Sequence, residues 1–290
     1  MYRTNYCLKI LFSSFTLLLF ISSSTTNIPD STNNIPEEAL VGHWTFDNEE
    51  NIAMDNSHYS SHGKLRGNPK IASGIIGKGC LELDGDGDYM EILDKGETPS
   101  QFHTLEKGSI SFWFKARSIP KGTSISPLLY YGNASGCENM KDASNEGLVI
   151  EVAHGKIKEE SQGVYFTVFN NPCQLPTVCF DTHSEPHLED KQGIIQLREW
   201  YHFVAIVGED YNTGYLNGEE ISYRHYNFSN SEASQFFGNA LSHDRMWLGK
   251  GFWDYGKETY FNGFIDDIRI YNVPLDAKQV KNLYDMRTGN

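Results

Sequence analysis

The chain has 290 residues, of which 38 are acidic and 24 are basic, so its formal net charge at pH 7 is −14. An acid excess without basic clusters disfavours polyphosphate partners, and we expect no nucleic acid ligand. The carboxylates are available to a cation such as calcium, although solubility alone also accounts for an acidic surface.

The N-terminus has the order of a secretory signal peptide, in which basic residues precede an apolar stretch at 10–21 and small serines follow it. This stretch is shorter than the roughly 20 apolar residues that a spanning helix needs. We therefore expect a signal peptide at 1–24 with cleavage near Ser24, a secreted protein, and no membrane insertion after cleavage. Asn133 and Asn227 begin glycosylation sequences that matter only in a eukaryotic source.

Residues 25–39 are polar, contain prolines and lack apolar periodicity, which predicts a linker. Residues 40–290 contain no second break of this kind. Because all-β domains of this size commonly form one unit, we expect a single folded domain over this range.

Cys7 leaves with the signal peptide, so four of the five cysteines remain. An even number outside the cell indicates disulfides. Cys80 lies in a strand pattern, whereas Cys137, Cys173 and Cys179 lie in loop-like sequence. We expect at least one bridge among these three and leave the pairing open. Their scattered spacing disfavours zinc.

Short segments rich in β-branched and aromatic residues recur along residues 40–290 and end at Gly, Pro, Asn or Asp, which predicts an all-β sandwich or barrel. The predicted strands cover residues 81–84, 109–114, 147–152, 164–169, 201–207 and 265–271. Asn217-Gly218 predicts a two-residue hairpin turn. Only the C-terminus has a helical pattern, with Asp276 and Gln279 forming a capping box.

Six segments stand in a specific order, at residues 40–47, 79–85, 109–114, 199–204, 214–218 and 261–275. Together they resemble the laminin-G-like domains of the concanavalin A-like lectin/glucanase superfamily. The resemblance implies an antiparallel jelly-roll β-sandwich, here with a short C-terminal helix. Trp44 with Phe46, and Phe112 with Phe114, are each two residues apart, so these side chains should point into the core.

The resemblance also implies calcium near the meeting point of the first and last strands. The matching positions are Asp47, the loop 55–62 that begins with Asp55, and Asp266. Calcium takes six to eight oxygen ligands, which two carboxylates, loop carbonyls and water could supply. In the alternative interpretation, Asp47 and Asp55 serve turns, and Asp266 pairs with Arg269 or a backbone amide.

Catalytic motifs of related architectures are missing from the sequence. Glucanases of this architecture carry acidic residues that alternate along one strand, and no such motif or Gly-x-Ser-x-Gly elbow occurs. The nearest pairs, Glu146 with Glu151 and Glu82 with Glu91, lack that spacing. We therefore predict a binding module that is not an enzyme.

Trp253, Asp254 and Tyr255 occupy a glycine-flanked segment that we expect to be a loop. Aromatic rings stack on sugars and an aspartate accepts bonds from hydroxyls, so these residues are the predicted site for a glycan or glycoprotein partner. Alternatively, the segment packs against its own sheet. Tyr130 and Tyr131 are a weaker candidate. The other functions considered are a protein-interaction or adhesion domain without a sugar site and, less favoured, a glycan-active enzyme.

Overall fold

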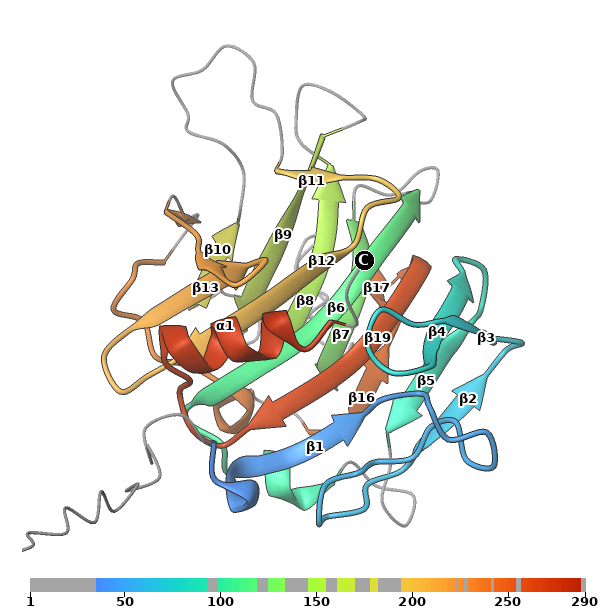
Figure 1. Cartoon of the computed structure of the whole chain (residues 1–290). Coiled ribbons are helices and arrows are strands. Elements are labelled where there is room, and N and C mark those ends of the chain that lie inside the picture. The colour runs from blue at the N-terminus through green and yellow to red at the C-terminus, as the bar shows by residue number, and fades with distance from the viewer. Residues whose placement is uncertain are drawn as a thin grey trace, which may run out of the picture. The chain divides into compact units, whose positions relative to one another are not determined.

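A computed structural model of the chain describes residues 35–92, 99–118, 125–133, 146–154, 161–169, 178–181, 194–222, 224–226, 229–240, 243–253 and 257–287. These residues belong to one compact unit built mainly of antiparallel strands (Figure 1). The predicted signal peptide lies outside the described residues. Within the predicted linker, Glu37–Ala39 form a short 3-10 helix and Ala39 is buried, so ordered structure extends N-terminal to residue 40.

The first sheet has the strand order β14-β13-β12-β6-β19-β4-β3, and β1 also pairs with β19. Its strands are Leu40–Trp44 (β1), Lys70–Ser73 (β3), Gly79–Asp84 (β4), Gly108–Ser118 (β6), Tyr201–Val207 (β12), Asn212–Leu216 (β13), Glu219–Glu220 (β14) and Asn262–Tyr271 (β19). Four of the predicted strands lie in this sheet. The predicted hairpin turn joins β13 to β14, with φ of 53° at Asn217 and 81° at Gly218.

The second sheet has the order β15-β10-β9-β8-β7-β16-β5-β2, with β11 beside β9. Its strands are Gly63–Arg66 (β2), Tyr89–Ile92 (β5), Ile125–Asn133 (β7), Glu146–His154 (β8), Ser161–Val168 (β9), Val178–Asp181 (β10), Ile195–Gln196 (β11), His225–Tyr226 (β15) and Arg245–Leu248 (β16). The predicted strands 147–152 and 164–169 correspond to β8 and β9.

The cysteines depart from expectation at one position. Cys179 lies in β10, which pairs with β9, so its assignment to a loop was wrong. Its segment, Val-Cys-Phe, suits a paired strand despite the polar sequence around it. Cys80 is a buried free thiol in β4, in the strand expected for it. Cys137 and Cys173 lie outside the described residues, and their predicted bridge stays a prediction.

The core fills the space between the two sheets. Trp44 and Phe46 reach it from the N-terminal segment, and Phe112 and Phe114 reach it from β6. All four side chains are buried, which confirms the predicted orientation. Apolar residues of β8 and β9 complete the core from the second sheet.

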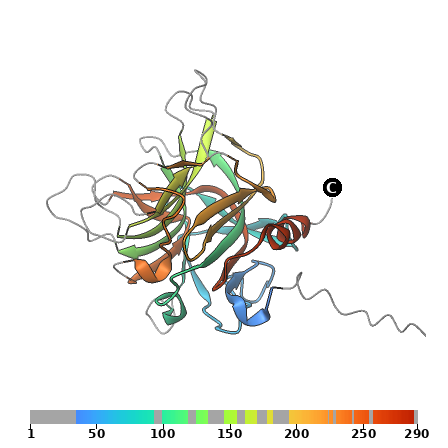
Figure 2. The same ribbon diagram turned by 90° about the vertical axis from the view of Figure 1, so that its left-hand side faces the viewer.

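Helix α1, Ala277–Asp285, packs on the outer face of the first sheet (Figure 2), where Val280 and Leu283 contact a cluster that includes Val204. The predicted capping box is present: the Gln279 amide donates to Asp276 Oδ1 at 2.8 Å, and the Asp276 amide donates to Gln279 Oε1 at 2.9 Å. Within the described residues, no helix has the length and apolar character needed to cross a membrane.

Strand β19 lies in the middle of the first sheet and changes neighbour along its length. One edge pairs with β6, while the other pairs with β4 over residues 262–265 and then with β1 over residues 268–271. The register shifts between Asp266 and Arg269, and Asp267 has a φ of 47°, which aspartate tolerates better than most residues. The two aspartates therefore occupy the junction between β4 and β1.

Candidate functional site

An aromatic cluster lies on the outer face of the second sheet. Successive strand residues alternate between faces. In β16, Met246 and Leu248 belong to the core, so Trp247 between them faces outward. Tyr130 in β7 pairs with Trp247 and shares its face, with the ring centroids 5.6 Å apart. We define the aromatic cluster as Tyr130, Val149, Trp247 and Phe252, with Tyr89 and Phe169 partly buried against it.

A separate hairpin lies over this face. It consists of Lys250–Trp253 (β17) and Lys257–Tyr260 (β18). The ring of Phe252 lies 5.4 Å from that of Tyr130, and a Cβ atom at Gly251 would lie 2.9 Å from Pro127 Cβ. The glycine therefore permits close approach to β7. Our expectation of a loop was wrong for residues 250–253, because Phe252 finds a packing surface on the sheet.

One of the predicted ligand residues, Trp253, belongs to this hairpin. Trp253 is the last residue of β17 and pairs with Lys257 in β18. Asp254 and Tyr255 lie outside the described residues. The backbone of residues 250–253 therefore lies beside the aromatic cluster, while the role of Trp253, Asp254 and Tyr255 as ligand residues stays a prediction.

The side chain of the first hairpin residue, Lys250, is enclosed by aromatic rings. Lys250 is 6% exposed, and its Nζ lies 4.6 Å from the ring centroid of Trp247, 4.7 Å from that of Tyr89 and 5.4 Å from that of Tyr260. The ammonium also pairs with Glu258 at 2.7 Å. Hydrogen bonds from Lys250 and Tyr260 hold the pKa of Glu258 below its ordinary value. Charge and aromatic surface are thus combined at fixed positions.

The border of the cluster is open to solvent. Tyr89 and Tyr260 are partly exposed, with ring centroids 6.3 Å apart. Burial, followed by the charge of Glu91, raises the pKa of Tyr89, and Arg66 and Arg245 act in the opposite direction. Partly exposed rings beside several hydrogen-bonding charges are the combination that a sugar-binding surface requires.

Most of this cluster escaped the sequence analysis. Of the weaker candidates, Tyr130 belongs to the aromatic cluster, whereas Tyr131 belongs to the core, where its hydroxyl lies 2.6 Å from His243 Nδ1. The missed residues are Tyr89, Arg245, Trp247, Lys250 and Tyr260. Their one sequence signal is the alternation of Arg-Met-Trp-Leu in β16, which indicates a strand with a charged and aromatic outer face.

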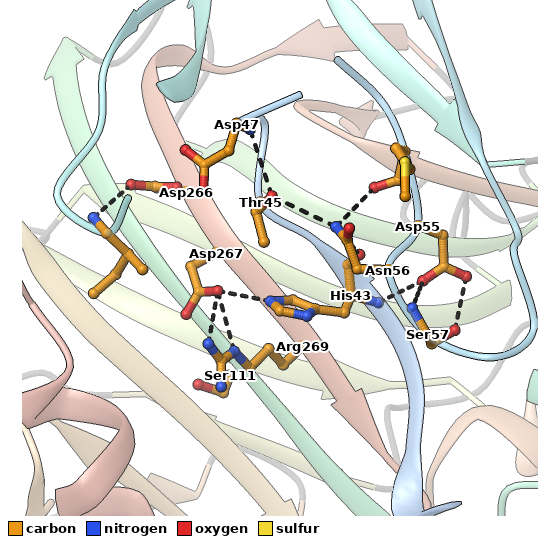
Figure 3. Close-up of polar contacts among 12 residues, drawn as sticks. His43, Thr45, Asp47, Asp55, Asn56, Ser57, Ser111, Asp266, Asp267 and Arg269 are labelled. Carbon is orange, nitrogen blue, oxygen red and sulfur yellow. Dashed lines mark hydrogen bonds and ion pairs between the residues drawn. The ribbon is translucent and has the colours of Figure 1, made fainter. Parts of the chain in front are cut away.

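Asp55, a predicted calcium ligand, is 1% exposed and organises the loop that follows it (Figure 3). Its Oδ1 accepts the amides of His43 at 2.8 Å and Ser57 at 2.9 Å. Its Oδ2 accepts the Ser57 hydroxyl at 2.9 Å and the Ser61 amide at 2.7 Å. Both oxygens therefore bind the chain itself, as in the alternative interpretation of this residue.

Asp47 fixes the end of the turn between β3 and β4. Its Oδ1 accepts the amides of Lys78 at 2.5 Å and Gly79 at 2.8 Å. Its other oxygen lies against Gly77, where a Cβ atom would be 2.2 Å away. Gly77 has a φ of 64°, so the close approach of Asp47 and the backbone conformation both favour glycine there.

Asp266 holds the same turn from β19. Its Oδ2 accepts the amides of Ile75 at 2.8 Å and Ile76 at 3.0 Å, while its Oδ1 is buried without a hydrogen-bond partner. Burial raises the pKa of this carboxyl to about 7. Its partner is a pair of backbone amides, whereas Arg269 pairs with Asp267. Across the described residues, no group of three or more His, Cys, Asp or Glu side chains is arranged to hold a metal.

Two histidines lie near this junction but form no catalytic triad. His43 Nε2 lies 2.8 Å from Asp267 Oδ1 (Figure 3). His202 Nε2 lies 2.9 Å from Ser111 Oγ. Although burial opposes it, the contacts with His43 and Arg269 hold the pKa of Asp267 below its ordinary value. Ser111 and His202 are each 1% exposed, so a substrate cannot reach that hydroxyl.

One pair of glutamates considered for catalysis, Glu82 with Glu91, does not converge. Glu82 in β4 pairs with Arg117 in the first sheet, whereas Glu91 in β5 pairs with Arg66 in the second. Glu151 is partly buried in β8, and desolvation raises its pKa to about 8. Two of these glutamates therefore serve ion pairs in different sheets.

Two face-to-face antiparallel sheets, a helix over one and an aromatic cluster on the other, define a lectin-like β-sandwich. The chain belongs to the concanavalin A-like lectin/glucanases superfamily, whose laminin-G family model matches residues 84–281. This confirms the predicted family and fold class. A search of curated protein sequences gives no match.

Three solved structures of similar fold contain a bound ligand or protein partner. Domain 4 of AbnA, an extracellular arabinanase of Geobacillus stearothermophilus, in complex with arabinotriose, is 20% identical, with a TM-score of 0.53 over 84% of this chain and 98% of that one. The Ruminococcus gnavus IT-sialidase CBM40 with bound α2,3 sialyllactose is 19% identical, with a TM-score of 0.51 over 71% and 95%. The binding domain of botulinum neurotoxin DC with rat synaptotagmin II is 13% identical, with a TM-score of 0.56 over 86% and 52%, so the match spans about half of that chain. At these identities the similarity establishes the fold alone.

Proposed function

We propose that the protein is a secreted, non-catalytic binding module for a glycan or glycoprotein, and that its ligand contacts the hairpin β17–β18 and the border of the aromatic cluster. One observation carries the proposal: partly exposed Tyr89 and Tyr260 lie beside fixed charges on the outer face of the second sheet. Structures of this fold with bound arabinotriose and sialyllactose support it by analogy.

Replacing Trp253 with alanine should lower glycan affinity by about fivefold to thirtyfold, since stacking on one aromatic ring contributes on the order of 1–2 kcal/mol. Tyr255→Ala should act in the same direction. A glycan-array screen of the mature chain, in calcium and again in EDTA, measures this. Trp200→Ala is the matched control, because Trp200 is a partly exposed tryptophan whose ring lies against Phe264 in the first sheet. Equal retention by the Trp253 and Trp200 variants would exclude the hairpin tip from the site.

A protein ligand is the second candidate. The toxin binding domain with the same fold is in complex with synaptotagmin II, so sandwiches of this kind also engage proteins. In that case the wild-type chain binds no glycan on the array, and the partner must be sought among proteins.

We further propose that residues 1–24 direct secretion. Accumulation of the full-length chain inside expressing cells, with no cleavage near Ser24, would exclude this.

We also propose that calcium binds at Asp266 and Asp47, with loop carbonyls and water completing the shell. The buried, unpartnered Oδ1 of Asp266 fits a cation ligand, whereas the fully bonded oxygens of Asp55 do not. The ion would supply stability and no reaction chemistry.

At pH 8, where Asp266 is largely ionised, calcium at 100 times its dissociation constant should stabilise the wild-type chain by about 2.7 kcal/mol relative to EDTA. This stabilisation is measured as the rise in Tm between EDTA and calcium. Asp266→Asn should abolish the rise, because the asparagine side chain can still accept the hydrogen bonds from the amides of residues 75 and 76 but carries no charge. Asp84→Asn, which changes an exposed aspartate, should leave the increase intact. Identical melting of the wild type in calcium and EDTA would remove calcium from the proposal.

A further inference from the structure

The border of the aromatic cluster contains three cations, and two of them are already neutralised. Arg66 pairs with Glu91 on the outer side of β2 and β5. Lys250 pairs with Glu258 and is almost completely buried. Neither is free to bind an anion without losing its present partner.

Arg245, the third cation, is different. It is the first residue of β16 and is exposed, and its guanidinium carbon lies 5.2 Å from the ring centroid of Trp247. Among the described residues, no carboxylate forms an ion pair with it. Contact with the indole ring favours a defined position for the guanidinium group, whose N–H groups can then donate to a ligand.

This arrangement suits one class of ligand group. A planar guanidinium with free edge donors binds a planar carboxylate through two parallel hydrogen bonds. The partly exposed rings of Tyr89 and Tyr260 are surfaces on which the apolar face of a sugar ring could lie, and the Tyr89 ring lies 5.8 Å from that of Trp247. The charge of Arg245 acts on both Tyr89 and Glu258, which places it at the same border.

The net negative charge of the chain bears on which anionic ligands the site can hold. With a net charge of −14, the protein repels anions at long range, so an anionic ligand must be held by local, directional contacts. Such a site favours a sugar with a single carboxylate over a polyanion. We propose that the ligand carries a carboxylate on a sugar, as in sialic or uronic acids, and that Arg245 is its anion-binding residue. The inference rests on the proposed glycan-binding function and specifies its ligand class.

The test compares four probes by isothermal titration calorimetry with the full mature chain. The probes are sialyllactose, sialyllactose with its carboxyl group reduced to an alcohol, galacturonic acid as its methyl glycoside, and neutral lactose. The wild-type chain is expected to bind at least one carboxylate probe at least tenfold more tightly than lactose. The two carboxylate probes separate a sialic acid from a uronic acid as the source of the group.

Arg245→Lys retains the charge but loses the two-donor fork, and is expected to weaken carboxylate binding about tenfold; Arg245→Gln should weaken it more. Both variants should have the same melting temperature as the wild type, because Arg245 is exposed. Arg117→Gln is the matched control, since its guanidinium lies 4.3 Å from the Phe264 ring centroid in the first sheet.

The outcomes separate the inference from the proposed function. If lactose and the reduced probe bind as tightly as the carboxylate probes, and Arg245→Gln changes nothing, then the anionic ligand class is wrong and glycan binding stands. If carboxylate binding is unaffected by Arg245→Gln, Arg245 is not the anion-binding residue. If neither these probes nor a glycan array gives binding to the wild type, both proposals fail.

Discussion

Asp55→Ala is expected to lower the free energy of unfolding by about 4 kcal/mol. The carboxylate is buried and accepts four hydrogen bonds, three of them from backbone amides of His43, Ser57 and Ser61. Without it, these donors stay buried near the end of β1 and lack a partner. Urea denaturation in EDTA measures the loss under conditions in which no metal contributes.

Asp84→Ala is the matched control for this experiment. Asp84 is exposed at the end of β4, and its carboxylate accepts one hydrogen bond, from the backbone amide of Asp86 at 2.8 Å. Its replacement should cost less than about 1 kcal/mol. Asp55→Asn should be nearly as damaging as Asp55→Ala, because its amide group would face donors at one of the two oxygen positions. A loss for Asp55→Ala no larger than that for Asp84→Ala would show that the loop does not depend on this carboxylate.

Acid is expected to destabilise the domain through His202. Burial lowers its pKa to about 3, and its Nδ1 is buried without a hydrogen-bond partner. Because the unfolded chain takes up the proton near pH 6.5 and the folded chain does not, stability is complete above pH 6.5 and falls as the pH drops towards 3. Between pH 6.5 and 5 the loss should be about 2 kcal/mol, at 1.36 kcal/mol per pH unit.

His202→Gln isolates this contribution. The glutamine amide can approach Ser111 Oγ, which lies 2.9 Å from His202 Nε2, but it does not titrate. The variant will be less stable at pH 7, yet its unfolding free energy should change less between pH 7 and 5 than that of the wild type. His243, whose pKa burial also lowers, supplies a remaining acid dependence in both proteins. Parallel pH profiles for the two proteins would contradict the assignment to His202.

The fold was accessible from the sequence because its signals are local. Period-two alternation placed Phe112 and Phe114 in the core, and the Asn217-Gly218 pair fixed a hairpin. Cys179 and the segment 250–253 were misassigned for a common reason. Both are short strands in polar or glycine-rich sequence, where pairing with a neighbouring strand outweighs weak local preference.

The candidate site was harder to predict from the sequence, because its residues come from segments that are distant in the chain. Tyr89, Trp247 and Tyr260 lie on β5, β16 and β18, and only the folded sheet brings them together. The sequence does indicate the charges near the junction of β19, but it does not show which donors they accept. Asp266 and Asp267 are adjacent in the chain, yet one holds a turn at residues 75–76 and the other binds His43.

The change of neighbour along β19 has a consequence for the time course of folding. Among the described strands, β1 is the first and pairs with β19, the last of them, with Leu40 lying opposite Tyr271. During synthesis, β1 therefore has no strand to join until the final residues of the domain leave the ribosome. Long-range pairing of this kind slows folding, so the first sheet should close only after residues 268–271 have left the ribosome. A chain truncated before residue 268 would leave β1 unpaired, and it should be recognised by quality control as unfinished.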